Sequence, residues 1–223
     1  MKELKNIKNI LFDLDGVLYQ DLESVFGKVS KKMTEYISKK LDLDLKKAKE
    51  LQASYFHKYN TSLNGLMIHH DIKPEEFLKY VHNIDLSFMK KDLILKKELE
   101  NLNLKKFIFT NGSKEHANNI TTHLGINDLF NGLFDIVDAE FSPKPTAKAF
   151  DLMVKKFKII PKETLYIEDI AKNLSIGKER GTITAWLIND EYWGKKESDK
   201  EFIDYKIENL SLFLKEIRLL QNS

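Results

Sequence analysis

Four short runs of apolar, β-prone residues recur along the chain, and each is followed by a turn and a helical pattern. The runs lie at residues 9–15, 106–113, 164–170 and 182–188. Continuous apolar strands that alternate with helices are typical of a parallel sheet covered on both faces. The pattern therefore predicts an α/β fold with a Rossmann-like parallel-sheet core.

The interval between the first two runs is much longer than a simple crossover, which needs about a dozen residues. Apolar positions spaced by three and four predict a helix over residues 22–41. Further helical patterns follow at residues 44–58 and from Pro74, a residue suited to the first turn of a helix. A last amphipathic helix is predicted near the end of the chain, over residues 207–220.

These patterns predict a helical insert that begins directly after the first strand. Such an insert would lie over the carboxyl ends of the strands, where open α/β sheets bind ligands. It would act there as a lid. We expect a core domain of residues 1–16 and 91–223 and an inserted α-helical cap domain of residues 17–90.

Polar residues with related chemistry stand where the predicted strands end. In a parallel sheet these ends share one edge, so their side chains are expected to converge. They include carboxylates, a hydroxyl, an amide and a lysine enclosed by two prolines. The residues are Asp13 and Asp15 after the first strand, Thr110, Asn111 and Gly112 after the second, Glu168 and Asp169 after the third, and Lys144 in "FSPKP".

This set suits phosphoryl transfer. A phosphate monoester and an attacking carboxylate are both anionic, so a divalent cation and a lysine are needed to hold them together. Asp13 and Asp169 offer the hard oxygen ligands that magnesium prefers. Asp15 could protonate the leaving oxygen and later deprotonate water. Gly16 would let the chain turn sharply and approach the phosphate.

In order, the segments "DLDGV", "FTNG", "KP" and "ED" resemble the four motifs of the haloacid dehalogenase-like (HAD) hydrolases. The resemblance implies a magnesium-dependent phosphatase that works through an aspartyl-phosphate. It implies Asp13 as nucleophile and Asp15 as acid/base. It further implies Mg2+ ligands at Asp13, Asp15 (through its backbone carbonyl) and Asp169, phosphate binders at Thr110, Asn111 and Lys144, and supporting roles for Glu168 and Gly16.

The resemblance extends into the insert, where residues 55–87 are similar to the cap of bacterial pyrimidine 5'-nucleotidases. It implies hydrolysis of UMP or CMP and a role in nucleotide metabolism. Gly16 stands where this subgroup often has Asn, and Ile170 where it often has Ser, which bears on specificity. The alternatives are a phosphatase or phosphomutase for another small metabolite, such as phosphoglycolate or a sugar phosphate, a haloacid dehalogenase, or a catalytically idle binding protein.

Within the insert, "YNTSLNGLM" breaks helical periodicity, and its Asn64-Gly65 pair predicts a turn. A turn on a lid that faces the site is where substrate specificity would reside. The six histidines show no metal-ligand spacing, and we expect structural or surface roles for them. The cap candidates for substrate contact are Tyr59, Thr61, Leu66 and Met67.

Composition adds constraints on partners and compartment. With 36 basic and 34 acidic residues, the net charge of +2 gives no reason to expect a nucleic acid polymer or a membrane as partner. The absence of cysteine excludes disulfides and thiolate catalysis, and we expect a cytoplasmic protein without a signal peptide. The expected partner is a small-molecule phosphomonoester, and the expected assembly is a monomer or homodimer.

Overall fold

A parallel six-stranded sheet forms the centre of the computed structural model, which describes residues 2–222. The strand order is β3-β2-β1-β4-β5-β6, and every neighbouring pair is parallel. This confirms the predicted Rossmann-like α/β fold. The strands are β1 (Asn9–Phe12), β2 (Lys105–Phe109), β3 (Gly132–Phe134), β4 (Thr164–Glu168), β5 (Ile183–Leu187) and β6 (Tyr205–Ile207).

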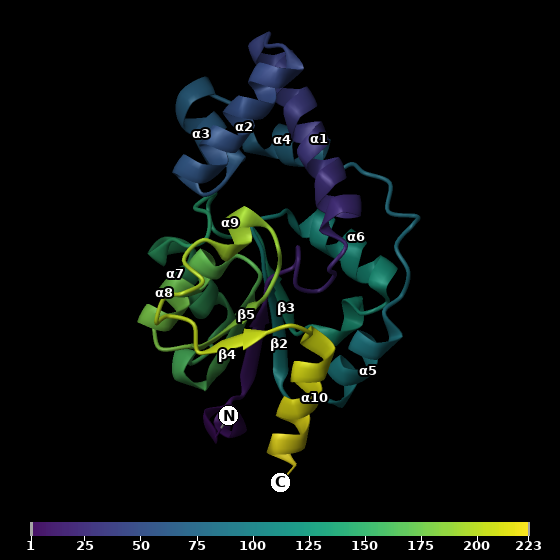
Figure 1. Ribbon diagram of the computed structural model, residues 1–223, viewed down its shortest axis with the longest axis vertical. Helices are drawn as coiled ribbons and strands as arrows, with labels where there is room; N and C mark the ends of the chain where they lie inside the picture. The colour runs from purple at the N-terminus through teal and green to yellow at the C-terminus, as the bar shows by residue number, and fades with distance from the viewer. Residues whose placement is uncertain (1, 223) are drawn as a thin grey trace.

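Helices cover both faces of the sheet, so the central strands are buried on both sides (Figure 1). Successive side chains of a strand point to opposite faces. Ile10 and Phe12 accordingly pack with α5 (Leu93–Asn101), α6 (Lys114–Leu124) and α10 (Leu210–Gln221). Leu11 packs on the other face with α7 (Ala147–Phe157) and α8 (Leu174–Glu179).

Short helical turns complete the core, and the first of them, η1, contacts α10 below the sheet in Figure 1. Within residues 2–222, no helix combines the length and the apolar character needed to cross a membrane. The short elements are η1 (Lys2–Asn6), η2 (Asn127–Leu129), η3 (Pro161–Glu163), η4 (Ala171–Asn173) and α9 (Tyr192–Lys195).

The first four of the five α-helices described between β1 and β2 stand beyond the carboxyl edge of the sheet, at the top of Figure 1. They share a separate apolar cluster that includes Ile37, Leu66 and Val81. We call them the cap helices. The boundaries of a cap domain at residues 17 and 90 remain a prediction. The cap helices are α1 (Leu22–Leu41), α2 (Leu45–Tyr59), α3 (Ser62–His70) and α4 (Pro74–Val81).

Local sequence signals explain where the cap helices begin. Asp21 accepts a hydrogen bond from the Ser24 backbone N–H, and Asp44 does the same for Lys47, so both act as N-caps. Pro74 occupies the first turn of α4. The helices predicted at residues 22–41 and 44–58 and from Pro74 are thus present.

The turn predicted at Asn64-Gly65 is wrong, because both residues lie inside α3. Thr61 caps this helix by accepting from the Asn64 backbone N–H at 3.1 Å. A Cβ at Gly65 would lie 2.4 Å from Cγ of Tyr55. The glycine therefore allows α3 to pack closely against α2.

The strands are shorter than predicted at their carboxyl ends. β1 ends at Phe12 and not at residue 15, because the chain turns through Gly16, whose φ is +83°. The sequence reasoning also missed β3 and β6, which have three residues each. Runs this short do not generate a readable apolar pattern.

The cap core supplies a stability prediction. Leu66 is 0% exposed, so Leu66→Ala should lower the free energy of unfolding by about 2–5 kcal/mol through lost burial and a cavity. Leu45, in α2, is 60% exposed, and Leu45→Ala should change it by less than about 0.5 kcal/mol. Urea unfolding followed by circular dichroism measures both. Equal losses in the two variants would contradict the described cap core.

Candidate active site

The register of the three central strands brings the predicted site residues together. Phe12 pairs with Ile108 of β2 and with Ile167 of β4. The residues that follow these strands therefore share one edge of the sheet, beneath the cap helices. Asp13, Thr110, Glu168 and Asp169 are all buried there.

Lys144 lies at the centre of this edge, although it belongs to the loop between β3 and α7, far from β1 in sequence. Its ammonium group donates to Oδ1 of Asp13 at 2.6 Å, to Oε1 of Glu168 at 2.5 Å and to the Phe109 carbonyl at 2.9 Å. The side chain is only 2% exposed. A buried ammonium group is stable only when it is paired in this way. Burial alone would lower the pKa of Lys144, but Asp13 and Glu168 outweigh it and raise the pKa overall. The ammonium group therefore stays charged.

Asn111 and Thr110 shape the loops around Lys144. The Asn111 side-chain oxygen accepts from the Lys144 backbone N–H at 2.9 Å, and Thr110 Oγ1 accepts from the Gly112 backbone N–H at 2.9 Å. Both residues also line the cavity between core and cap. Their predicted contact with a phosphate group remains a prediction.

Glu168 is fixed by three hydrogen bonds to its Oε1, one of them from Lys144. Its Oε1 accepts from Tyr166 Oη at 3.0 Å and from Asn173 Nδ2 at 3.1 Å, in addition to Lys144. With Oε1 so occupied, this carboxylate is fixed in place. It is suited to orienting Lys144.

Asp169 has an oxygen that is free to bind a ligand. Its Oδ1 is buried and has no hydrogen-bond partner within residues 2–222, which is costly unless a ligand satisfies it. One carboxylate oxygen from each of Asp13, Glu168 and Asp169 lies within 4.8 Å of the others. A divalent cation that prefers hard oxygen ligands fits this donor set.

Gly16 makes this arrangement possible. A Cβ at this position would lie 2.3 Å from Oδ2 of Asp169, closer than any real contact allows. The positive φ of Gly16 is also unfavourable for residues with a Cβ. The glycine therefore brings the β1 loop directly against Asp169.

The crowding of carboxylates changes their protonation. Burial and the neighbouring Glu168 raise the pKa of Asp13 to about 8, although Lys144 acts in the opposite direction. Burial, with Asp13 and Glu168 nearby, also raises the pKa of Asp169. Lys144 compensates only part of the negative charge, so the cluster favours an additional cation.

Asp15 points into a different environment from that of Asp13. Its Oδ1 accepts hydrogen bonds from Tyr19 Oη and from His116 Nε2, the latter at 3.1 Å. Burial acts to raise the pKa of Asp15, but His116 and the Tyr19 hydrogen bond outweigh it and lower the pKa overall. The two aspartates therefore have separate partners and opposite pKa shifts.

Two of the six histidines, His116 and His82, line the cavity, which the sequence analysis did not predict for either. His116 lies in the first turn of α6, whose N-cap is Ser113. Its position three residues after a cap that follows a central strand could have identified it. His82 immediately follows α4, and no sequence signal connects it with the site.

The cavity between core and cap measures about 290 Å³ and includes only one of the four predicted cap contacts, Thr61. Leu66 and Met67 pack in the cap core, and Tyr59 Oη is hydrogen-bonded to His69. The turn that would have exposed them is a helix. Other cap residues line the cavity in their place, notably Ser30, Gln52, Asn60 and Ser62, as well as Phe26, Phe56 and Leu63.

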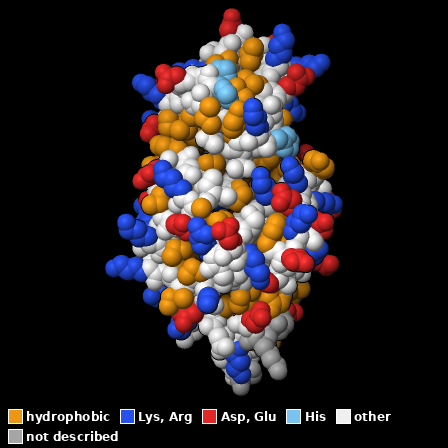
Figure 2. All heavy atoms as spheres, turned by 90° about the vertical axis from the view of Figure 1, so that its left-hand side faces the viewer, with side chains coloured by type: hydrophobic (Ala, Val, Ile, Leu, Met, Phe, Trp, Pro, Cys, Tyr) orange, Lys and Arg blue, Asp and Glu red, His pale blue; other side chains and the backbone are white. Residues whose placement is uncertain are grey.

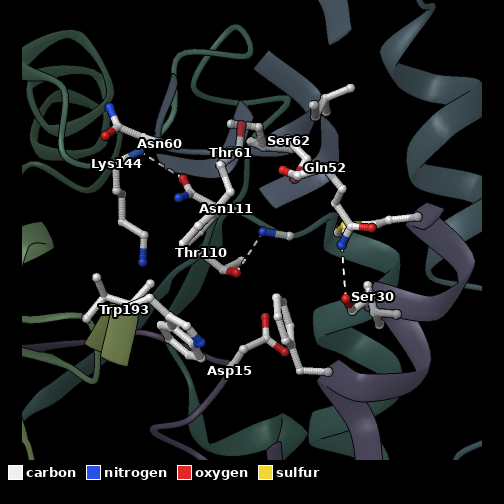
Figure 3. A pocket seen from close by; sticks show the side chains of 18 of the residues that line it. Asp15, Ser30, Gln52, Asn60, Thr61, Ser62, Thr110, Asn111, Lys144 and Trp193 are labelled. Carbon is white, nitrogen blue, oxygen red and sulfur yellow. Dashed lines mark hydrogen bonds between the residues drawn. The ribbon is translucent and has the colours of Figure 1, made fainter. Parts of the chain in front are cut away.

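Figure 3 shows the polar floor and the cap wall of this cavity. Asp15 and Thr110 lie on the core side, and Gln52 and Ser30 face them from the cap helices. Gln52 Nε2 donates to Ser30 Oγ at 2.9 Å. Trp193, from α9 of the core, adds an aromatic wall against the cap. On the outer face in Figure 2, acidic and basic side chains intermingle over both cap and core.

A parallel sheet that ends in buried carboxylates and a lysine, with helices inserted after its first strand, is the architecture of a HAD-type α/β enzyme. The family model for haloacid dehalogenase-like hydrolases matches residues 7–181. The chain belongs to this family, as the four motifs predicted.

Curated relatives include enzymes named as phosphatases. A glyceraldehyde 3-phosphate phosphatase of Methanocaldococcus jannaschii is 27% identical over 227 residues, covering 92% of this chain and 94% of its own. Phosphate metabolism protein 8 of Saccharomyces cerevisiae is 32% identical over 161 residues, or 65% of this chain. The match spans half of the yeast protein's length.

Solved structures share the fold over almost the whole chain. A HAD phosphatase of Thermococcus onnurineus superposes with a TM-score of 0.61 at 20% identity, covering 95% of this chain and 98% of its own. A HAD hydrolase of Bacillus subtilis bound to magnesium has a TM-score of 0.57 at 16% identity, covering 98% and 100%. At these identities the likeness concerns the fold.

The raised pKa of Asp13 predicts a pH-dependent stability. Between its ordinary pKa of 3.8 and about 8, the folded metal-depleted protein holds a proton that the unfolded chain has lost. The free energy of unfolding should therefore fall as pH rises through this window, and Mg2+ should restore it at pH 8 by binding the ionised form. Thermal melts of EDTA-treated protein measure the effect. The fall should be smaller in Asp13→Asn, and parallel curves for the two proteins would contradict the assignment.

Proposed function

We propose that this protein is a Mg2+-dependent phosphomonoesterase that works through an aspartyl-phosphate on Asp13. The observation that carries the proposal is the position of Asp13. This residue lines the cavity, and its Oδ1 accepts a hydrogen bond from the buried ammonium group of Lys144. A charged lysine at this point suits a dianionic phosphate next to an attacking carboxylate. Membership of a hydrolase family and relatives named as phosphatases support it.

The proposed reaction has two steps on the side chains of this protein. An Asp13 oxygen attacks phosphorus and the bond to the leaving oxygen breaks, while Asp15, which has first taken up a proton from solvent, gives that proton to the leaving oxygen. Asp15, now a carboxylate, then takes a proton from a water molecule that attacks the aspartyl-phosphate. Inorganic phosphate leaves and Asp13 is regenerated. Thr110, Asn111 and Lys144 bind the phosphoryl oxygens throughout.

The residues that would hold the magnesium ion are Asp13, Asp169 and the backbone carbonyl of Asp15. The unpartnered Oδ1 of Asp169 and the close approach allowed by Gly16 support this set. When bound, the ion would neutralise charge on the phosphoryl oxygens and the carboxylates. Glu168 is committed to Lys144 and would support the site from outside the ligand set.

For the substrate, we propose a pyrimidine nucleoside monophosphate such as UMP or CMP. The cavity is lined by Phe26 and Phe56, each of which contacts the ring of Trp193 with centroids about 6 Å apart. A planar base can stack on such a wall. Beside it, the Gln52 amide and Ser30 hydroxyl offer hydrogen-bonding groups for the polar edge of a base.

The second candidate is a phosphatase for a small phosphorylated sugar or triose. The supporting observation is the relative from M. jannaschii, named for glyceraldehyde 3-phosphate, which matches nearly the full length of both chains. A phosphomutase is the other predicted alternative, and β-phosphoglucomutase of Clostridium difficile shares the fold with a TM-score of 0.60 at 16% identity. The leaving group distinguishes these substrates, and the chemistry at Asp13 is common to them.

Replacing the nucleophile tests the proposed chemistry. Asp13→Asn should reduce phosphate release from 4-nitrophenyl phosphate and UMP by more than roughly a thousandfold, because no carboxylate remains to attack phosphorus. Malachite-green assays and thermal melts would separate lost turnover from lost folding. EDTA should also stop the wild-type reaction. Retained turnover in Asp13→Asn refutes the nucleophile, and activity that survives EDTA favours dehalogenase-like chemistry.

Removing the aromatic wall tests the proposed substrate. Trp193→Ala should lower kcat/KM for UMP about tenfold, since stacking of a base on an aromatic ring is worth about 1–3 kcal/mol. Ribose 5-phosphate, which lacks a base, should lose less than about twofold. Trp193→Phe should preserve most of the activity on UMP.

Tyr192→Ala provides the neighbouring control, because Tyr192 is 80% exposed and does not line this cavity. Its activity on both esters should match the wild type. If UMP and CMP are hydrolysed no faster than ribose 5-phosphate, the nucleotidase proposal fails and the sugar-phosphate candidate replaces it.

A further inference from the structure

Two histidines from different parts of the molecule meet beside Asp15. His116 belongs to α6 of the core, and His82 immediately follows the cap helix α4. Their rings are stacked, with centroids 4.3 Å apart and an interplanar angle of 15°. Both line the cavity that contains Asp13 and Asp15.

His116 is committed to Asp15. It is 2% exposed, and its Nε2 lies 3.1 Å from Asp15 Oδ1. A carboxylate only accepts hydrogen bonds, so Nε2 carries the proton of this contact. The other ring nitrogen, Nδ1, has no hydrogen-bond partner within residues 2–222. The contact with Asp15 is therefore the one polar interaction of this ring that the structure describes.

His82 fixes the plane of the His116 ring from the cap side. Its Nδ1 forms a 2.8 Å hydrogen bond with Oγ of Ser113, the N-cap of α6. This bond ties the end of α4 to the first turn of α6, and the stacked rings fill the space between them. A continuous series of contacts therefore runs from the cap through His82 and His116 to Asp15.

We propose that His116 and His82 are positioning residues for Asp15. His116 holds the Asp15 carboxyl in the orientation required at the leaving oxygen, and His82 holds His116 when the cap rests on the core. This inference rests on the proposed phosphatase function and adds two positioning residues to it.

The leaving group provides a readout that separates this role from simple structural support. An alkyl phosphate expels a basic alkoxide and needs a proton from Asp15, whereas 4-nitrophenyl phosphate expels a stable phenolate and needs it much less. The value of kcat/KM reports all steps up to departure of the leaving group. The alkyl ester to use is whichever of UMP, CMP and ribose 5-phosphate the wild-type protein hydrolyses fastest.

His116→Ala should lower kcat/KM for this alkyl ester by about a hundredfold, the usual effect of misplacing a catalytic group. For 4-nitrophenyl phosphate the loss should be below about threefold. His116→Gln should recover most of the alkyl-ester activity, because its amide N–H can again donate to Asp15. The control is His123→Ala, an exposed histidine of the same helix, which should match the wild type.

The cap variants should show the same pattern in weaker form. His82→Ala should lower kcat/KM for the alkyl ester about tenfold and leave 4-nitrophenyl phosphate nearly unchanged. His82→Phe preserves a ring for stacking and should lie between His82→Ala and the wild type. If His116→Ala does not fold, as judged by circular dichroism, His116→Gln and the two His82 variants decide the question.

Equal losses on both esters, or no loss on either, would overturn the positioning role while leaving the phosphatase function intact. Failure of the proposed phosphatase function would give a different set of results. In that case the wild-type protein would hydrolyse neither ester, or Asp13→Asn would retain the wild-type rate.

Discussion

The structure depends on one buried ion-pair cluster, in which Lys144 joins Asp13 and Glu168 at the carboxyl edge of the sheet. Burying two carboxylates at the ends of central strands would be prohibitive without a cation between them. Lys144 offsets part of that cost and ties a distant loop to β1 and β4. Because Asp169 adds a third carboxylate, the cluster remains short of positive charge. That deficit is the physical basis for both a divalent cation and a phosphate ester in the proposed reaction.

Core and cap contribute different things to the site. The parallel sheet provides rigid strand ends, so the charged groups are placed by backbone geometry. The cap helices have their own apolar core and provide the walls of the cavity. His82 and Trp193 lie at the junction between the two parts, where His82 contacts α6 and Trp193 contacts Phe26 and Phe56. Charge chemistry thus belongs to the core, whereas the shape around a leaving group depends on how the cap meets it.

Prediction from sequence succeeded where the signal was local. The apolar runs and the residues that end them identified the central strands and the charged edge, and the three-and-four spacing identified α1 over residues 22–41. It failed where a residue's role depends on a remote neighbour. Gly65 looks like part of a turn, yet it lies inside α3, where its missing Cβ leaves room for Tyr55 of α2. Leu66 and Met67 were predicted to contact substrate because they follow this expected turn. They pack in the cap core instead.

The sequence by itself determined the fold class, the family and the set of groups at the sheet edge, because strand periodicity and strand-end residues are properties of short segments. Only the tertiary structure decided which partner each group has. Asp13 and Asp15 are two residues apart, yet one meets Lys144 and the other meets His116. Those partners lie more than a hundred residues further along the chain. Their approach is set by how α6, α4 and the Lys144 loop pack around the sheet, and no local pattern encodes such distances.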